Sequence, residues 1–573
     1  MLTRLETRVS ITSSSDVHDR AWDGNEMKTA ALAVTAALIA SCAMVGSASA
    51  QTLVDAPAGP LQGEAADGVN VFRGVPYALA PTGERRWRAP ADMPRWGQTR
   101  DATRFGAACH QPVARGESIY AGDAPTMSED CLFLNVWAPQ DSQDAPVFVW
   151  IHGGALNTGA SNEAMYDGAR MAAAQGMVVV SINYRLGVLG YLAHPELSAE
   201  SSQDVSGNYG LLDQIAALNW IKTNIAAFGG DPENVTIAGE SAGALSVMYL
   251  MASPQARGLF DRAIAQSAYM ISTPELRSSG HGDPAAESMG AWLQAQLGFA
   301  DLADLRAMDA QTLTTSALAK GYAPWGTIDG KVLPEQLVEV FDKGEQAPVP
   351  LLIGFNAGEI RSLRFLLPPS PPTDPVVYER EIRERYGVLA DDFLRLYPAS
   401  DLEQSLLAIP RDGLYGWTAE RMVRLQARTG QPGYLYFFDH GYPAMEEADL
   451  HAFHASEIPF VFGTADLTPA RWPEIPDTEA ERRFSEAMMA YWASFARTGA
   501  PTASGQPNWP AYGDDRTYMA FEAEPVVRKR LMPGMFETHE AVVCRRRAAG
   551  GIVWNWNFGV LSPPLPPEAP NCP

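Results

Sequence analysis

The stretch Val235-Thr236-Ile237-Ala238-Gly239-Glu240-Ser241-Ala242-Gly243 decides the fold that we expect. A short β-branched run enters a Gly-x-Ser-x-Gly turn, and an Ala/Leu/Val/Met-rich run at residues 244–251 leaves it. Strand, tight turn and helix in this order form the context that a nucleophile elbow requires. The small residues Gly239 and Gly243 permit the sharp turn, and the N-terminus of the helix favours negative charge that develops beside Ser241. The alternative is an ordinary Gly/Ser-rich turn, but the flanking strand and helix favour a nucleophilic serine.

Apolar runs and helical patterns alternate around this stretch. Residues 147–151 and 178–184 are continuous apolar runs, which suit strands buried on both faces. At residues 208–228, apolar side chains recur at steps of three and four, as in a helix. Further strands are predicted at residues 132–137, 260–267, 349–353 and 434–438, the last strong strand, and further helices at 273–345 and 484–495. The alternation predicts an α/β fold with a mostly parallel central sheet and helices on both faces.

The overall composition bounds the class of protein. The chain has 573 residues, of which 46% are hydrophobic and 19% charged, as in a globular protein with a large core. The net charge of −24 argues against nucleic acid and anionic membrane surfaces as partners. No run of about 20 apolar residues follows the N-terminus, so no transmembrane segment is expected in the mature chain. We expect one domain at residues 51–561 and an irregular Pro-rich tail at residues 562–573.

Residues 1–50 have the pattern of a targeting segment. Met27-Lys28 opens a short basic region, residues 29–39 form an apolar run, and Ala48-Ser49-Ala50 is a small-x-small cleavage site. This pattern is typical of a secretory signal that is removed, so the mature protein is expected to be periplasmic or secreted. Since residues 1–26 do not fit before such a signal, we expect translation to start at Met27. The alternative is a lipoprotein box ending at Cys42; the well-formed Ala-Ser-Ala site favours the free form.

Four cysteines remain after cleavage at Ala50, and their even number in an exported chain indicates disulfides. Four cysteines allow three connectivities, and closeness in the chain favours Cys109 with Cys131 and Cys544 with Cys572. The absence of Cys-x-x-Cys from the sequence argues against a zinc ribbon.

A nucleophilic serine needs a neighbouring base, usually histidine, and a carboxylate that orients the base. On a scaffold with a nucleophile elbow, the chain order is serine, acid, histidine. His281 comes too early for this order, so the residues alone leave open His440, His451, His454 and His539. The acid must follow a sheet strand, and the carboxylates in such positions are Glu359, Asp439 and Asp449.

The tetrahedral oxyanion of ester hydrolysis needs hydrogen-bond donors, each worth about 3–4 kcal/mol in the transition state. One donor is the backbone N–H of Ala242, the residue after the candidate nucleophile. The second source is the glycine stretch His152-Gly153-Gly154, which follows the strand predicted at residues 147–151. A glycine stretch before the elbow strand matches the oxyanion loop of lipases and esterases, although a plain strand-end turn has the same composition.

Several motifs, in order, resemble those of the type B carboxylesterase family, which includes cholinesterases and bile-salt-activated lipase. They are Phe-Arg-Gly-Val-Pro-Tyr-Ala at 72–78, Ser-Glu-Asp-Cys-Leu-Phe-Leu-Asn-Val at 128–136, Gly-Asn-Tyr-Gly-Leu-Leu-Asp-Gln at 207–214, Phe-Gly-Gly-Asp-Pro at 228–232 and the elbow at 239–243. The likeness extends over residues 52–512, and the motifs together are far more specific than Gly-x-Ser-x-Gly alone. The resemblance implies an α/β-hydrolase fold with helical insertions around an active-site gorge.

The resemblance also selects among the open residues. His-Ala-Ser-Glu-Ile-Pro-Phe-Val-Phe-Gly at 454–463 is similar to the family's catalytic-histidine stretch, which implies His454 as the base and leaves His451 as a neighbour rather than a metal ligand. Glu359 stands where the family places its acid. The likeness further implies a disulfide between Cys109 and Cys131, a supporting role for Ser267, and an oxyanion hole made by the N–H groups of Gly154, Ala155 and Ala242.

Three positions depart from the family pattern. Ala155 stands where a third glycine is usual, so we expect its methyl group close to the acyl group. Glu359 lacks the flanking Asp and Gly that are common in the family, which leaves the chemical type of the acid unchanged. Cholinesterases carry a tryptophan between the first two cysteines, where it holds a quaternary ammonium by cation–π attraction. Here Tyr120 is the only aromatic residue in that segment, which argues against a choline ester as the substrate.

The sequence therefore predicts an exported serine carboxylesterase that hydrolyses a small-molecule ester through an acyl-enzyme on Ser241. His454 is expected to transfer the proton and Glu359 to orient His454, and this chemistry needs no cofactor or metal. Two alternatives remain. One is a non-catalytic binding protein of the same fold, although such relatives typically lose the serine. The other is a lipase, which adds an apolar lid that the sequence does not clearly show. The acyl and alcohol preference and the oligomeric state do not follow from the sequence.

Overall fold

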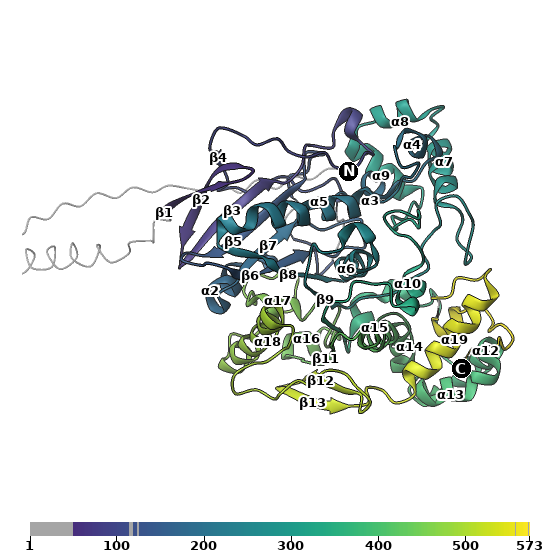
Figure 1. The fold of residues 1–573 in the computed structure, drawn as a ribbon. Helices are drawn as coiled ribbons and strands as arrows, with labels where there is room; N and C mark the ends of the chain where they lie inside the picture. The colour runs from purple at the N-terminus through teal and green to yellow at the C-terminus, as the bar shows by residue number, and fades with distance from the viewer. Residues whose placement is uncertain (1–49, 114–117, 123–124, 556, 571, 573) are drawn as a thin grey trace, which may run out of the picture. The chain divides into compact units, whose positions relative to one another are not determined.

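Strand β8 (Gly230–Glu240), which ends directly before Ser241, lies in the middle of a large sheet (Figure 1). The computed structural model describes residues 50–573 except 114–117, 123–124, 556, 571 and 573. The predicted leader, with Met27 and Cys42, lies outside the described residues apart from Ala50. Residues Ala50–Pro573 form one compact unit.

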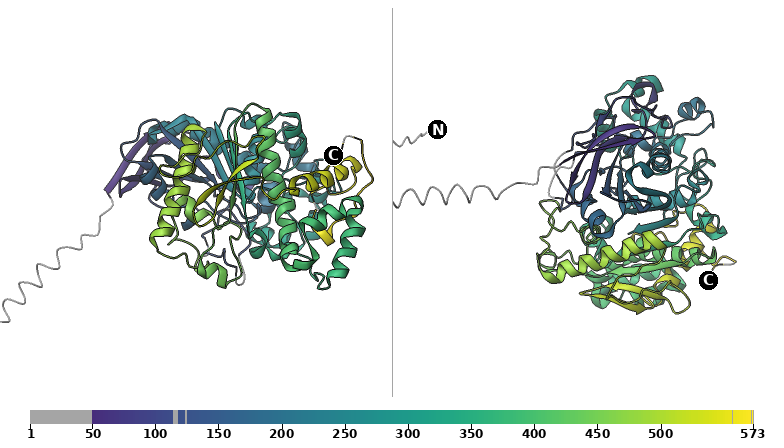
Figure 2. Two further views of the ribbon diagram at one scale, coloured as in Figure 1. Left: turned by 90° about the horizontal axis from the view of Figure 1, so that it is seen from below. Right: turned by 60° about the vertical axis from the view of Figure 1, so that its left-hand side comes forward.

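The strand order is β1-β2-β3-β5-β7-β6-β8-β9-β10-β11-β12-β13, with β4 beside β2, in the described part of the chain. Strands β7 to β12 in this order pair in parallel, and the remaining pairs towards both ends are antiparallel, β2 with β4 excepted. The purple strands β1–β3 and the yellow-green strands β12–β13 mark the two ends (Figure 2). The bounds are β1 (Ala50–Ala56), β2 (Gly59–Ala66), β3 (Val69–Pro76), β4 (Arg100–Asp101), β5 (Phe133–Pro139), β6 (Ala145–Ile151), β7 (Val178–Ile182), β9 (Arg262–Gln266), β10 (Leu351–Asn356), β11 (Gly433–Phe438), β12 (Thr517–Phe521) and β13 (Pro525–Lys529). This mostly parallel sheet confirms the predicted fold class.

Central strand β6 shows how the sequence builds two cores. All its residues are buried, and successive side chains point to opposite faces. Val147, Val149 and Ile151 pack in one hydrophobic cluster, and Phe148 and Trp150 pack in another. Each such fully buried side chain contributes about 1.5–3 kcal/mol to folding. The first cluster includes residues of α5 (Tyr209–Asn224), α6 (Ala242–Ala252) and α15 (Trp417–Arg428), and the second of α2 (Ala169–Gln175), α17 (Ile458–Phe462) and α18 (Glu479–Thr498).

The chain forms further helices besides these six. A π-helical segment, Asp412–Gly416, joins α14 to α15. Among the described residues, none of the helices combines the length and apolar character of a segment that crosses a bilayer. The remaining helices are α3 (Gly187–Tyr191), α4 (Pro195–Glu200), α7 (Ala286–Leu297), α8 (Leu302–Ala307), α9 (Ala310–Ala319), α10 (Leu337–Lys343), α11 (Glu359–Ser362), α12 (Pro375–Tyr386), α13 (Ala390–Leu396), α14 (Leu402–Arg411), α16 (Pro443–Glu447) and α19 (Met535–Ala549).

Two strands follow the one predicted as the last strong strand. β12 pairs in parallel with β11, and β13 returns antiparallel along β12. Both are five residues long, and the second half of β13 is Val527, Arg528 and Lys529 with an exposed end. Such short runs give little periodic signal, which explains why the sequence pattern did not single them out.

Both favoured disulfides are present. Cys109 is joined to Cys131, and Cys544 is joined to Cys572. The first closes the loop of residues 109–131 before β5, and the second ties α19 to the Pro-rich tail.

Candidate active site

Ser241 occupies a strained turn between β8 and α6. Its backbone has φ 56° and ψ −120°, a conformation that residues with a side chain rarely adopt. Its N–H donates to the carbonyl oxygen of Gln266 on β9 at 2.9 Å, and its carbonyl oxygen accepts from the N–H of Leu245 at 2.9 Å. Ser241 is thus the N-cap residue of α6, where the helix dipole favours developing negative charge.

Two glycines make this turn sterically possible. A Cβ atom at Gly243 would lie 2.0 Å from the carbonyl oxygen of Ile151 on β6. A Cβ atom at Gly239 would lie 2.5 Å from the carbonyl carbon of Gly243. Both obstacles are main-chain atoms that no side-chain rotation can remove, so these two positions require glycine.

The glycine stretch after β6 lies against the elbow. A Cβ atom at Gly153 would lie 2.8 Å from the carbonyl oxygen of Glu240 and 3.2 Å from the Cβ atom of Ser241. Gly154 has φ 100° and Ala155 has φ 54°, so the chain turns sharply there. Among the described residues, the N–H groups of Gly154, Ala155 and Ala242 have no hydrogen-bond partner. Unpaired N–H groups are rare inside proteins, and these are free to bind an oxyanion.

His152 supports the same loop from behind. Its ring stacks on Tyr184 with a centroid separation of 4.5 Å, and its Nδ1 lies 2.9 Å from the carbonyl oxygen of Gly153. The Tyr184 hydroxyl donates to the carbonyl oxygen of His152 at 2.8 Å. Burial lowers the pKa of His152 to about 4, so the ring stays neutral and its Nδ1–H donates to Gly153.

Glu359 and His454 meet in the interior of the protein. Glu359 is the first residue of α11, directly beyond β10, and is fully buried. Its Oε1 accepts from the N–H of Asn356 at 2.8 Å, and its Oε2 lies 2.5 Å from Nδ1 of His454. The structure therefore brings these two predicted residues together, although they are 95 positions apart in the chain.

The other ring nitrogen of His454 faces the elbow. Nε2 lies 3.0 Å from Oε1 of Glu240, the residue directly before Ser241. This contact is an ion pair rather than a hydrogen bond, since Glu240 Oε1 has no hydrogen-bond partner among the described residues. Nor does the Ser241 hydroxyl form a hydrogen bond within that part of the chain. His454 thus lies between two carboxylates, with one of them next to the candidate nucleophile.

Buried carboxylates dominate the electrostatics of the site. Burial alone lowers the pKa of His454, but the negative charges of Glu240 and Glu359 outweigh burial and raise it to about 9. Burial raises the pKa of Glu240 to about 8, an effect that His454 opposes and that neighbouring carboxylates reinforce. Burial also raises the pKa of Glu457, which accepts from the side chains of Gln266 and Asn356. The site therefore stabilises an imidazolium at His454.

The other carboxylates and histidines considered from the sequence lie elsewhere. Each has partners that explain its presence without a role at Ser241: His440 contacts Glu481, His451 contacts both Asp439 and Glu446, Asp449 pairs with Arg361, and His539 contacts Tyr397 and Asn557. Within the described residues, no group of three or more His, Cys, Asp and Glu is arranged to hold a metal ion. Ser267 is buried beside the elbow strand, and its hydroxyl has no partner among the described residues; its supporting role stays a prediction.

Sequence reasoning gave no role to several residues of the site. Glu240 lies inside the quoted motif, but only the structure shows its contact with Nε2 of His454. Asn356, at the end of β10, donates to the carbonyl oxygen of Phe453 at 2.8 Å. The ring of Tyr415, in the π-helical segment, lies 5.5 Å from the ring of His454. The position of Asn356, three residues before a predicted acid, was the one usable sequence signal among these.

The sheet order, with a serine turn after a central parallel strand, defines an α/β-hydrolase fold. A solved PNB esterase structure superposes with a TM-score of 0.74 at 33% identity, covering 85% of this chain and 99% of that chain. The Geobacillus stearothermophilus carboxylesterase Est55 at pH 6.2 gives a TM-score of 0.70 at 34% identity, covering 87% and 99%.

The chain belongs to the carboxylesterase family, whose sequence pattern matches residues 50–536. The para-nitrobenzyl esterase of Bacillus subtilis (strain 168) is 36% identical over 501 residues, which cover 84% of this chain and 98% of that protein. The fumonisin B1 esterase of Sphingopyxis macrogoltabida is 35% identical over 486 residues, which cover 81% and 85%. The protein is therefore a carboxylic ester hydrolase, and the resemblance drawn from its motifs is confirmed.

Proposed function

We propose that the protein hydrolyses small-molecule carboxylic esters through an acyl-enzyme on Ser241. The Ser241 oxygen attacks the ester carbonyl carbon while His454 Nε2 takes the hydroxyl proton. His454 then gives this proton to the leaving alcohol. In the second half of the reaction, water attacks the acyl-enzyme while His454 takes a proton from the water, and His454 returns the proton to the Ser241 oxygen as the acid is released. Glu359 keeps the Nδ1 of His454 protonated, so that Nε2 is the basic nitrogen, and stabilises the imidazolium that forms.

The buried contact between Glu359 Oε2 and His454 Nδ1 carries this proposal. It fixes the ring so that Nε2 faces the turn that holds Ser241. Catalytic hydrogen bonds in free enzymes are often long and shorten once the substrate is bound, so the unpaired Ser241 hydroxyl is compatible with the assignment. We assign the oxyanion hole to the N–H groups of Gly154, Ala155 and Ala242, since they are unpaired in the described structure and flank the elbow.

Hydrolysis of a p-nitrophenyl ester series from acetate to palmitate tests the proposal, with Ser241→Ala as the matched control. We expect measurable turnover of the short esters and a loss of at least about 10⁴-fold in kcat for the variant, with an unchanged melting temperature. Undiminished turnover by Ser241→Ala would refute the mechanism. A sharp rise in activity above the solubility limit of a triglyceride would instead favour a lipase.

The name of the Bacillus subtilis relative suggests a further ester to test as a substrate. We propose that para-nitrobenzyl esters are accepted, because the matched region covers 98% of that relative. Choline esters are not expected, since no tryptophan lies between Cys109 and Cys131. Comparing kcat/KM for a para-nitrobenzyl ester and a choline ester of the same acid checks both statements.

We also propose that the protein is exported, since its two disulfides suit an oxidising compartment. A mature N-terminus at Gln51, in a periplasmic or medium fraction, is the expected finding. A lipid-modified N-terminus at Cys42 would favour the anchored form, and full-length protein in the cytoplasm would contradict export.

A further inference from the structure

Three successive carbonyl oxygens at the candidate catalytic histidine are each held by a hydrogen bond from another segment. The donors are the N–H of Gly358 to Ala452 at 2.7 Å, the amide of Asn356 to Phe453 at 2.8 Å, and the hydroxyl of Tyr120 to His454 at 2.9 Å. The first two donors belong to the turn that carries Glu359. The third comes from the loop of residues 109–131, which no step of the proposed mechanism uses.

The carbonyl group that Tyr120 contacts belongs to a peptide unit in a costly orientation. The next residue, Ala455, has φ 69°, in the left-handed region that residues other than glycine avoid. Such a conformation persists only where the surroundings fix it. The hydrogen bond from Tyr120 fixes this peptide unit directly at His454.

Tyr120 also contacts the helix that carries the acid. Its hydroxyl oxygen lies 2.7 Å from Oγ of Ser362, the last residue of α11, whose first residue is Glu359. Its ring packs against Phe453 and Trp472, with centroid separations of 6.4 and 6.0 Å. Burial raises the pKa of Tyr120 well above its ordinary value, so the phenol keeps its proton as a donor. A single hydroxyl group therefore contacts the segments of both the acid and the base.

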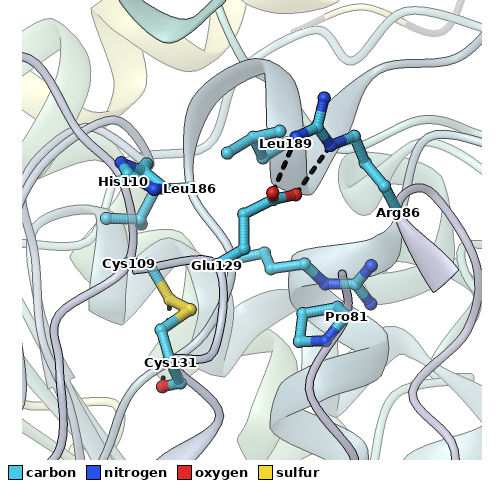
Figure 3. Close-up of a pocket in the computed structure, with 9 residues that line it drawn as sticks. Pro81, Arg86, Cys109, His110, Glu129, Cys131, Leu186 and Leu189 are labelled. Carbon is cyan, nitrogen blue, oxygen red and sulfur yellow. Dashed lines mark hydrogen bonds and ion pairs between the residues drawn. A yellow bond between two sulfur atoms is a disulfide. The ribbon is translucent and has the colours of Figure 1, made fainter. Parts of the chain in front are cut away.

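The loop that carries this phenol is anchored near both ends. The disulfide between Cys109 and Cys131 closes it, and the guanidinium of Arg86 holds Glu129 through two hydrogen bonds of 2.6 Å (Figure 3). The Gln111 side chain pairs with the main chain of Gly159, accepting from its N–H at 2.9 Å and donating to its carbonyl oxygen at 3.0 Å. The loop thus contacts the histidine and also Gly159, where a Cβ atom would lie 2.7 Å from the carbonyl oxygen of Gly153 in the glycine stretch.

We propose that Tyr120 is a positioning residue, which holds the main chain of His454 so that the imidazole stays aligned between Glu359 and Ser241. The inference rests on the proposed triad and adds to it a residue that acts through His454. Tyr120 replaces no catalytic group and takes no part in the proton transfers of the reaction.

Tyr120→Phe tests this role, since it keeps the ring and removes the donor. We expect kcat to fall about tenfold with KM within about twofold, because misplacing a catalytic group by a fraction of an ångström lowers the rate of the chemical step. The acid limb of kcat/KM should move to lower pH, since a looser contact with Glu359 raises the pKa of His454 less. The matched control is Tyr322→Phe, which removes a buried hydroxyl that donates to the carbonyl oxygen of Tyr191 at 2.9 Å. The control should lose a similar amount of thermal stability and keep its kcat.

Adding Tyr120→Phe to two other variants distinguishes a positioning role for Tyr120 from a general effect on stability. In Glu359→Gln, the added Tyr120→Phe change should cost less than about twofold, because the alignment it protects is already lost. In Ala455→Gly, where the left-handed conformation has no steric cost, the loss should shrink to about threefold. Wild-type kcat in Tyr120→Phe, or a tenfold loss that persists in Glu359→Gln, would overturn the inference. Ser241→Ala in the same assays distinguishes this failure from a failure of the proposed function. If Ser241→Ala is inactive, a negative result for Tyr120 leaves the proposed function intact. If Ser241→Ala is active, the proposed function itself is overturned.

Discussion

The nucleophile and the base of the candidate site are held in different ways. Ser241 is fixed by main chain: a strand enters it, a helix leaves it, and its N–H donates to the neighbouring strand. His454 lies in irregular chain between α16 and α17 and is fixed by groups from distant segments. The elbow is therefore rigid for steric reasons, whereas the position of the histidine depends on a few hydrogen bonds.

This difference predicts how substitutions near Ser241 and near His454 affect folding and activity. A change at the elbow collides with main chain and affects folding itself. A change around His454 removes a hydrogen bond and affects the alignment of the ring while the sheet stays intact. Substitutions at the elbow should thus lower activity and stability together. Substitutions around His454 should lower activity much more than stability.

The largest effect is expected from Gly243→Ala. The new Cβ atom would lie 2.0 Å from the carbonyl oxygen of Ile151, so the sheet or the turn has to move, which costs about 3 kcal/mol or more. We expect a low yield of folded protein, a lower melting temperature and no esterase activity. Gly513→Ala is the control, since its Cβ atom would meet nothing within 4 Å and its φ is not positive. A folded and active Gly243→Ala would show that the elbow is not sterically fixed.

A smaller and more selective effect is expected from Asn356→Ala. The change removes the donor to the carbonyl oxygen of Phe453, the residue before His454, and one donor to Glu457, three residues after it. We expect kcat to fall about 10- to 100-fold and the free energy of unfolding to fall by only about 1–3 kcal/mol in total, because Glu457 keeps its hydrogen bond from Gln266. Steady-state kinetics with thermal unfolding measures both effects. The control is Asn219→Ala, which removes a side-chain hydrogen bond within α5 and should leave kcat unchanged. A wild-type kcat in Asn356→Ala would contradict the account of how His454 is held.

The smallest effect is a shift of the pH profile. His454 acts as a base only when it is neutral, and the carboxylates of Glu240 and Glu359 raise its pKa to about 9. Activity should therefore rise with pH through the raised pKa, so that kcat/KM still increases above pH 7. Glu240→Gln removes one of the two charges and should move this acid limb to lower pH. An acid limb at the same pH in both proteins would show that Glu240 does not act on His454.

The sequence predicted those parts of the site that contiguous residues build. Ser241, the glycine stretch and the strands behind them follow from local patterns, because the turn and its steric limits lie within a few residues. The choice of Glu359 and His454 came from the family resemblance, since their contact joins residues that only the fold brings together. The five-residue strands β12 and β13 carried too little periodicity to be found.

Tyr120 shows the limit of local reasoning most clearly. In the sequence, Tyr120 is the only aromatic residue between Cys109 and Cys131, and this observation was used only to argue against a choline ester as the substrate. Its hydrogen bond to the main chain of His454 joins residues 334 positions apart, and a backbone carbonyl oxygen leaves no trace in the sequence. Glu240 was hidden for a related reason, because a variable place in a motif does not show which way its side chain points.

The central claim is that Glu359 and His454 activate Ser241, and labelling by an organophosphate tests it most directly. A fluorophosphate is attacked by an activated serine and leaves a phosphoryl group that mass spectrometry locates on one peptide. We expect a single adduct on Ser241 in the wild-type protein, and labelling slower by at least about 10³-fold in His454→Ala. An adduct on another residue, or labelling of Ser241 at an equal rate without His454, would contradict the account.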